Sequence, residues 1–214
     1  KSVERTKERP IASGKISVSK AFGYIVVLCL IALLILLQFN LLTIILGMSS
    51  MILAFVYPFM KRITYWPQLF LGLTFNWGII MGWTSITNSI SIEPIILYFA
   101  AIFWTLGYDT IYGLQDVHDD EIIGTKSTAI KFKDNIKFFV STCYCLFVFF
   151  ILILLFMMEI SKSNLILAPL FILSLVYQIK IFNIEKPESC LKAFKNNNLV
   201  GIFIFIFILS FLIS

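Results

Sequence analysis

Charged residues are scarce in this chain. Of its 214 residues only 14% are charged, while 59% are hydrophobic. A soluble domain is typically about 25% charged and about 45–50% apolar. This composition excludes a water-soluble core beneath a solvated surface, and it predicts that the surrounding solvent is a lipid bilayer.

Patterns for disulfides and thiolate metal sites are lacking as well. The chain has a single histidine, His118, to which we assign no role, and four cysteines without a CxxC pair. We interpret the cysteines as small apolar packing residues. The basic, polar stretch 1–14 lacks the short apolar core of a signal peptide.

Long apolar runs fill the rest of the sequence. A membrane-spanning helix needs about 20 apolar residues, and seven segments meet this requirement: 18–38, 41–60, 66–86, 93–113, 136–158, 164–183 and 198–214. The runs are apolar on all sides, which a β-barrel strand is not. Only helices satisfy their backbone groups in lipid under these conditions. We therefore predict an all-α, polytopic membrane helix bundle.

The basic residues favour one side of this bundle. Seven spans place residues 1–17, 61–65, 114–135 and 184–197 on the same side of the membrane. Counting the adjoining helix ends, every Lys and Arg except Lys162 falls there. The positive-inside rule assigns that side to the cytoplasm or the mitochondrial matrix. The net charge of +5 is thus explained by topology, and we do not expect nucleic-acid binding.

Four of the twelve acidic residues lie between positions 108 and 120, where a span meets the longest loop on the basic side. Asp116 and Asp120 are four apart, so on a helix they share a face at a distance of about 6 Å. Two carboxylates this close repel each other unless a cation or proton lies between them. Mg²⁺ suits such a pair, with Asp119 as an auxiliary ligand. The alternative is a solvated acidic loop.

Other polar residues near the same side could bind a substrate. Asp109 and Tyr112 could line a cavity mouth, or the tyrosine could be an interfacial anchor. Lys61 and Arg62 could be a topological anchor, although arginine also recognises carboxylates in a bidentate manner. Basic clusters lie at both ends of the chain, around Arg5 and Arg9 and around Lys192 and Lys195. Together with Mg²⁺ they indicate a site for a lipid diphosphate.

Two amide side chains, Gln68 and Asn76, fall within an apolar run. Buried amides need hydrogen-bond partners, either in the protein or in a ligand. The residues alone do not decide between the two, and we predict Asn76 as a substrate-binding residue.

Four stretches together resemble a known family: RTKERPIASG (5–14), YPFMKRITYWPQLFLGLTFNWG (57–78), YDTIYGLQDVHDDEIIGTKSTAIKF (108–132) and KAFKNNNLVG (192–201). They are similar to the UbiA superfamily of intramembrane aromatic prenyltransferases. The second and third stretches favour the branch that prenylates 4-hydroxybenzoate in ubiquinone biosynthesis.

The resemblance implies nine helices around a central cavity and two aspartate-rich motifs that bind Mg²⁺-diphosphate. Asp116 and Asp120 match the second motif, and Arg62 matches an arginine that holds the carboxylate of the aromatic acid. Lys126 and Lys131 fall in the matching block, and we expect them to contact the diphosphate. The first motif, NDxxDxxxD, is expected immediately before residue 1. Residues 1–214 would then be one transmembrane domain holding the third to ninth helices of the family.

The implied activity is Mg²⁺-dependent transfer of a polyprenyl group from polyprenyl diphosphate to the 3-position of 4-hydroxybenzoate. The enzyme would lie in a bacterial inner membrane or a mitochondrial inner membrane. Alternatives are an inactive truncated remnant or a non-catalytic lipid-binding membrane protein. A small transporter is disfavoured because no charge lies in the middle of a predicted span.

Overall fold

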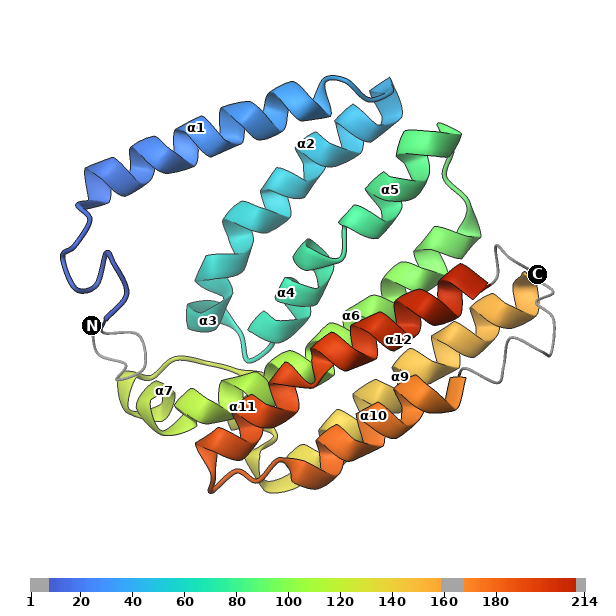
Figure 1. Cartoon of the computed structure of the whole chain (residues 1–214). Coiled ribbons are helices and arrows are strands. Elements are labelled where there is room, and N and C mark those ends of the chain that lie inside the picture. The colour runs from blue at the N-terminus through green and yellow to red at the C-terminus, as the bar shows by residue number, and fades with distance from the viewer. Residues whose placement is uncertain (1–7, 159–167, 211–214) are drawn as a thin grey trace.

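The computed structural model describes residues 8–158 and 168–210. In these ranges the chain forms α-helices joined by short 3₁₀ turns (Figure 1). The first half contains α1 (Val18–Leu36), α2 (Leu41–Val56), η2 (Tyr57–Phe59), α3 (Met60–Ile63), α4 (Pro67–Phe75), α5 (Gly78–Thr87) and α6 (Ile92–Gly113). The second half contains η3 (Leu114–Asp116), α7 (Val117–Ile123), α8 (Thr128–Lys131), η4 (Lys133–Asn135), α9 (Ile136–Met157), α10 (Ala168–Ile181), α11 (Pro187–Lys195) and α12 (Asn197–Leu209).

The predicted all-α membrane bundle is confirmed. Within the described ranges, six helical stretches are long and apolar enough to cross a bilayer: 18–36, 41–63, 67–87, 92–123, 133–157 and 187–209. α10 is a shorter apolar helix at the place of the predicted span 164–183, whose first residues lie outside the described ranges. This is an integral membrane protein.

The prediction that two segments are loops is wrong. Residues 114–135 are mostly helical and contain η3, α7, α8 and η4. Residues 184–197 contain α11, which begins at Pro187, a residue suited to the first helical position because it lacks an N–H group. Both segments carry enough apolar residues to dock on the bundle, as buried Val117, Ala129 and Ala193 do.

The predicted helix 66–86 is interrupted in its middle. α4 ends at Phe75 and α5 begins at Gly78. Asn76 causes the break locally, because its side-chain Nδ2 donates to the Gly72 carbonyl at 2.9 Å and to Thr105 Oγ1 of α6 at 2.8 Å. The Trp77 indole then donates to the Leu46 carbonyl of α2 at 2.9 Å. The break is therefore held by both neighbouring helices.

α6 is the centre of the bundle. Figure 1 shows α1, α2 and α4–α5 following one another on one side of α6, with α9, α10 and α12 grouped on the other. The main core lies where α6, α9, α10, α11 and α12 meet, around residues such as Val140, Phe147, Phe171 and Phe207. A smaller core formed by Ile80, Tyr98 and Ile102 joins α5 to α6.

A buried chain of polar side chains ties four helices together. Tyr144 of α9 donates to Gln178 of α10, whose Nε2 donates to Asn197 Oδ1 of α12 at 3.0 Å. The Trp104 indole of α6 donates to the same oxygen at 3.2 Å. Interhelical hydrogen bonds of this kind contribute about 0.6–2 kcal/mol each in membranes, so the network helps to set which helices are neighbours.

Gly107 of α6 is where Tyr144 packs most closely. A Cβ atom at this position would clash with Tyr144 Cε1. We predict that Gly107→Ala destabilises the protein by about 1–3 kcal/mol through overpacking, measured as thermal unfolding in detergent. Gly23→Ala in α1, where a Cβ meets nothing within 4 Å, is the control and should be neutral or slightly stabilising. Equal effects of the two changes would contradict this packing argument.

Candidate functional site

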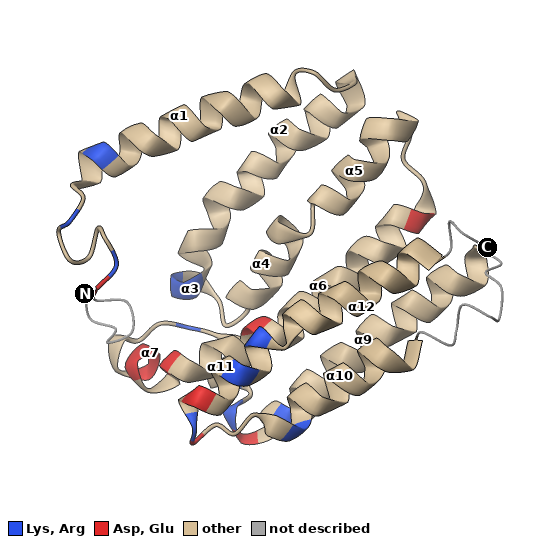
Figure 2. Ribbon diagram, in the orientation of Figure 1, with Lys and Arg blue, Asp and Glu red and all other residues tan. Residues whose placement is uncertain are grey.

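Charged side chains gather at one end of the bundle. Figure 2 shows basic and acidic residues on and around α3, α7 and α11 and at the adjoining end of α10, while the helical bodies are almost free of charge. Glu93 lies in the first turn of α6, the end opposite to the one that leads into α7. The concentration of charge predicted from the spans is thus present in the fold. We call this the charged end.

A small pocket at the charged end contains three carboxylates. We call it the acidic pocket; it has a volume of about 90 Å³ and is lined by Tyr57, Lys61, Pro67, Gln68, Asp109, Tyr112, Gly113, Asp116 and Asp120. The lining comes from η2, α3, α4, α6, η3 and α7. Of the predicted site residues, Asp109, Tyr112, Asp116, Asp120 and Lys61 are thereby brought together.

The acidic residues are placed by the change from α6 into α7. Asp116 ends η3 and is the N-cap of α7, and Asp120 follows one turn later and is 8% exposed. Both residues line the pocket, Asp116 from η3 and Asp120 from α7. Asp119 lies on the same helix but outside the pocket lining, and His118 is exposed.

The chain then folds back over the pocket. α7 ends at Ile123 and is capped by Gly124, whose φ of +78° is the left-handed conformation that glycine adopts without strain. The following residues return to α3 and α4: the Lys126 amide donates to the Lys61 carbonyl at 2.8 Å, and the Thr128 amide donates to Gln68 Oε1 at 3.0 Å. These two bonds position α7 and α8 against the helices that form the opposite wall.

Tyr112 is held by an aromatic contact from the other side. Its ring lies 4.4 Å from the ring of Phe194 in α11, and Tyr108 contacts the same phenylalanine at 5.9 Å. α11 thus packs against the end of α6 that carries Tyr108 and Tyr112.

The carboxylates do not form a ready-made metal cage. In the part of the chain that the structure describes, no three His, Cys, Asp or Glu side chains come close enough to hold an ion by themselves. This arrangement still fits Mg²⁺, which is usually held by one or two carboxylates and completed by water and substrate phosphates. Asp116 and Asp120 are the residues that would hold it.

Several predicted substrate-binding residues lie outside the acidic pocket. The Lys126 ammonium donates to the Ile63 carbonyl at 3.2 Å and lies over the Tyr65 ring. The Lys131 ammonium lies 4.7 Å from the centroid of the Trp66 ring. Such cation–π contacts contribute about 0.5–2 kcal/mol, so each ammonium is held against an aromatic ring; we call these two lysines of the charged end the basic rim.

The remaining predicted residues are also placed elsewhere. Arg62 is exposed on α3 next to Lys61, and Arg9 is exposed in the turn before α1. Asn76 is committed to the α4–α5 break described above. Arg5 lies outside the described residues.

Four pocket residues were not predicted as site residues: Tyr57, Pro67, Gln68 and Gly113. The signal for Gln68 was available, because an amide inside an apolar run requires a partner. The sequence could not show which of the two amides, Gln68 or Asn76, lies at the pocket, because that depends on the neighbouring helix that each one meets.

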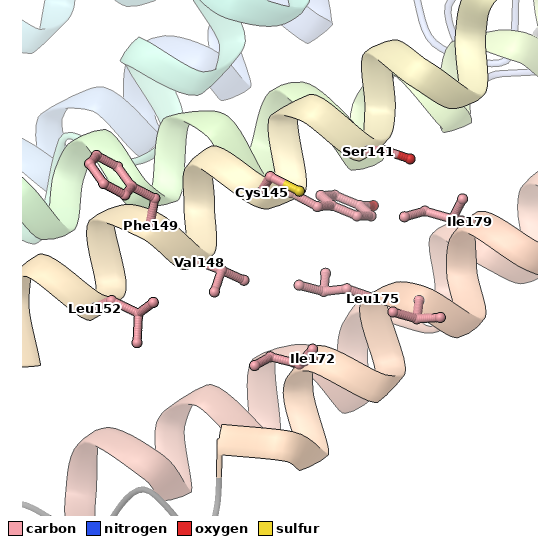
Figure 3. Close-up of a pocket in the computed structure, with 10 residues that line it drawn as sticks. Ser141, Cys145, Val148, Phe149, Leu152, Ile172, Leu175 and Ile179 are labelled. Carbon is pink, nitrogen blue, oxygen red and sulfur yellow. The ribbon is translucent and has the colours of Figure 1, made fainter.

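A second hollow of about 330 Å³ lies between α9 and α10 (Figure 3). Its wall is apolar apart from the hydroxyl groups of Ser141 and Tyr144 and the thiol of Cys145. It contains no charged side chain, so it offers no group to bind a diphosphate or a Mg²⁺ ion.

Comparison with known proteins agrees with this geometry. The sequence profile described as the UbiA prenyltransferase family matches residues 1–210. The chain belongs to the UbiA prenyltransferase family. The resemblance drawn from the four sequence stretches is therefore confirmed.

Three curated relatives are all named as 4-hydroxybenzoate polyprenyl- or octaprenyltransferases. The chain is 40% identical over 213 residues to the mitochondrial 4-hydroxybenzoate polyprenyltransferase of Bos taurus, covering 96% of this chain and 56% of that protein. The corresponding Homo sapiens protein gives the same values. The 4-hydroxybenzoate octaprenyltransferase of Pasteurella multocida is 37% identical over 204 residues, covering 95% of this chain and 70% of that protein. The chain thus spans little more than half the length of its mitochondrial relatives.

Solved structures share the fold. A UbiA homolog from Aeropyrum pernix K1, solved in its apo form, superposes with a TM-score of 0.77 at 20% identity, covering 95% of this chain and 78% of that one. A structure described as digeranylgeranylglyceryl phosphate synthase gives a TM-score of 0.64 at 18% identity, with coverage of 98% and 74%. At these identities the likeness establishes the fold alone.

The hydrogen bonds of Asn76 generate a test of its role. We predict that Asn76→Leu lowers the free energy of unfolding by about 1–3 kcal/mol, because the bonds to Gly72 and Thr105 are lost, as measured by thermal unfolding in detergent. Phe75→Leu, an exposed neighbour, is the control and should change little. An unchanged melting temperature together with weaker substrate binding would instead support the substrate-binding role.

Proposed function

We propose that this protein transfers a polyprenyl group from a polyprenyl diphosphate to the 3-position of 4-hydroxybenzoate, in a Mg²⁺-dependent step of ubiquinone biosynthesis. The observation that carries the proposal is the acidic pocket, in which Asp109, Asp116 and Asp120 line one small space at the charged end of a membrane bundle. The names of the curated relatives support the choice of both substrates.

The pocket supports binding of a diphosphate through a cation. Three carboxylates repel a free anion, so an anionic substrate enters only with a cation that the carboxylates bind. Asp116 and Asp120 are proposed to hold this Mg²⁺, with Asp119 as an auxiliary ligand from the same helix. When bound, the ion neutralises the negative charge that develops on the leaving diphosphate.

The reaction exchanges one bond for another. The bond between the allylic carbon and the diphosphate oxygen breaks, and the diphosphate leaves with the electron pair. A bond then forms between that carbon and the ring carbon ortho to the phenol hydroxyl of 4-hydroxybenzoate. The ring proton passes to a base or to the released diphosphate. Holding both substrates in contact supplies part of the rate.

The cationic residues are proposed to bind the two acids. Arg62 holds the carboxylate of the aromatic acid, for which a planar guanidinium is well matched. Lys61 lines the acidic pocket and is proposed to balance part of its charge. Lys126 and Lys131 of the basic rim, together with Arg9 and Arg5, are proposed to attract the diphosphate.

The apolar body of the protein supports a lipid substrate. The side chains of α1 are apolar and largely exposed, with no buried residue in that helix, and such a surface is stable only in lipid. We propose that the charged end faces the cytoplasm or the mitochondrial matrix, following the positive-inside rule. Residues 1–214 are proposed to act as one transmembrane domain.

Replacing the proposed metal ligands tests this function. Asp116→Ala or Asp120→Ala in the full-length protein should lower Mg²⁺-dependent turnover about 10²–10³-fold, because charge stabilisation of the leaving group is lost. Turnover is measured with labelled 4-hydroxybenzoate and a polyprenyl diphosphate, with and without EDTA.

Glu121→Ala is the matched control on the same helix. Glu121 is exposed and forms an ion pair with Lys133 at 2.8 Å, outside the pocket, so turnover should stay within about twofold. Near-normal activity of both aspartate variants would show that the metal assignment is wrong. A wild-type protein that binds the prenyl diphosphate without transferring the prenyl group would support the non-catalytic lipid-binding alternative.

Arg62 is tested by the two Michaelis constants. Arg62→Ala should raise the KM for 4-hydroxybenzoate about 10–100-fold, as expected for the loss of a charge-assisted hydrogen bond, and change the KM for the prenyl donor much less. Lys133→Ala, another exposed cation at the charged end, is the control. Equal effects on both substrates would indicate that Arg62 serves only as a topological anchor.

A further inference from the structure

Gln68 is a buried amide whose two polar ends have different surroundings. It is the second residue of α4 and is 4% exposed. Its Oε1 accepts a hydrogen bond from the backbone N–H of Thr128 at 3.0 Å. A backbone N–H can only donate, so the amide cannot be turned around without placing two donors against each other. The side-chain nitrogen of Gln68 must therefore face the other way.

That nitrogen lies beside the acidic pocket. Gln68 lines the pocket together with Gly113, and a Cβ at Gly113 would lie 3.3 Å from Gln68 Nε2. A residue larger than glycine at position 113 would thus press on the amide. Among the described residues, Nε2 has no hydrogen-bond acceptor, although Oε1 has its donor. The pocket consequently contains a neutral N–H donor that no protein atom in these ranges uses.

The charge and the lining of the pocket indicate which kind of group accepts a hydrogen bond from Gln68 Nε2. Its three carboxylates outnumber the single cation Lys61, so an anionic oxygen is bound more favourably when a further cation accompanies it. Its volume is about 90 Å³ and its lining is mostly polar, which suits a phosphate oxygen better than an apolar ring. A phosphate group that shares the ion with the carboxylates fits both conditions.

We propose that Gln68 Nε2 donates a hydrogen bond to an oxygen of the diphosphate group bound with Mg²⁺ in the acidic pocket. This inference deepens the proposed function and rests on it for the identity of the substrate. Gln68 then has two roles: its carbonyl end positions the segment that begins at Thr128, and its nitrogen end binds the leaving group. A neutral donor is suited to this place because it binds phosphate oxygen without neutralising the carboxylates that hold the ion.

Two substitutions separate these roles. Gln68→Glu keeps the size and the acceptor for the Thr128 amide but removes the donor. Gln68→Met removes both polar ends and adds no charge. The probe is inorganic pyrophosphate with Mg²⁺, titrated calorimetrically onto the full chain in detergent, and thermal unfolding is recorded for each variant.

Both variants should bind Mg²⁺-pyrophosphate about 10–100-fold more weakly than the wild type, the range expected for one hydrogen bond to a charged group. Only Gln68→Met should show a clearly lower melting temperature, because only it leaves the Thr128 N–H unsatisfied. In turnover, the KM for the prenyl diphosphate should rise while the KM for 4-hydroxybenzoate stays within about twofold.

The matched control is Gln115→Glu. Gln115 is a nearby amide in η3 whose Nε2 donates to the Tyr112 carbonyl at 3.0 Å, and it lies outside the pocket lining. It introduces the same charge as Gln68→Glu but should leave pyrophosphate affinity within about twofold. Retained affinity in Gln68→Met would overturn the inference, because the loss in Gln68→Glu would then be due to charge repulsion alone.

The outcomes distinguish this inference from the proposed function. If the wild type prenylates 4-hydroxybenzoate and Gln68→Met binds pyrophosphate normally, the function stands and the inference is wrong. If the wild type binds Mg²⁺-pyrophosphate through Gln68 but does not prenylate 4-hydroxybenzoate, the inference stands and the proposed acceptor is wrong. A wild type that does not bind Mg²⁺-pyrophosphate overturns the inference directly.

Discussion

The hydrogen bond from the Thr128 amide to the Gln68 side chain joins two segments that are 60 residues apart in the sequence. Thr128 is fully buried, so its backbone N–H must find a hydrogen-bond partner within the protein. With the bond from the Lys126 amide to the Lys61 carbonyl, it fixes the chain that leaves α7 against the start of α4. These bonds join the segment after α7, the helix that carries Asp120, to α3 and α4, which carry Lys61 and Gln68 of the acidic pocket.

The bundle uses its polar side chains in two distinct ways. Inside the apolar body they join helices, as in the chain from Tyr144 through Gln178 to Asn197 and in the bond from Tyr98 to the Leu73 carbonyl. At the charged end the carboxylates instead line a small space. The first group gives α6 and its neighbours a defined packing, which a uniformly apolar bundle in lipid would lack. This rigid body carries the pocket-lining end of α6.

The charged end is organised as an acidic centre with a basic rim. Lys126 and Lys131 lie over the aromatic rings of Tyr65 and Trp66 and are not part of the pocket lining, whereas Lys61 is. Cations at this end raise the rate at which an anion encounters it by long-range attraction. The arrangement agrees with the proposed binding of a metal-bound diphosphate, in which the rim attracts the anion and the centre holds the cation.

The sequence by itself determined the membrane helices, the family and the pairing of Asp116 with Asp120, because these follow from the length of apolar runs, from specific motifs and from the spacing of residues along one helix. It did not determine that 114–135 and 184–197 are helical, since docking on the bundle stabilises these short helices. Gln68 and Asn76 looked equivalent in the sequence. Only the tertiary structure decided that Asn76 is satisfied by Gly72 and Thr105 and that Gln68 keeps its nitrogen at the pocket, because a buried amide's partner is set by the helix packed against it.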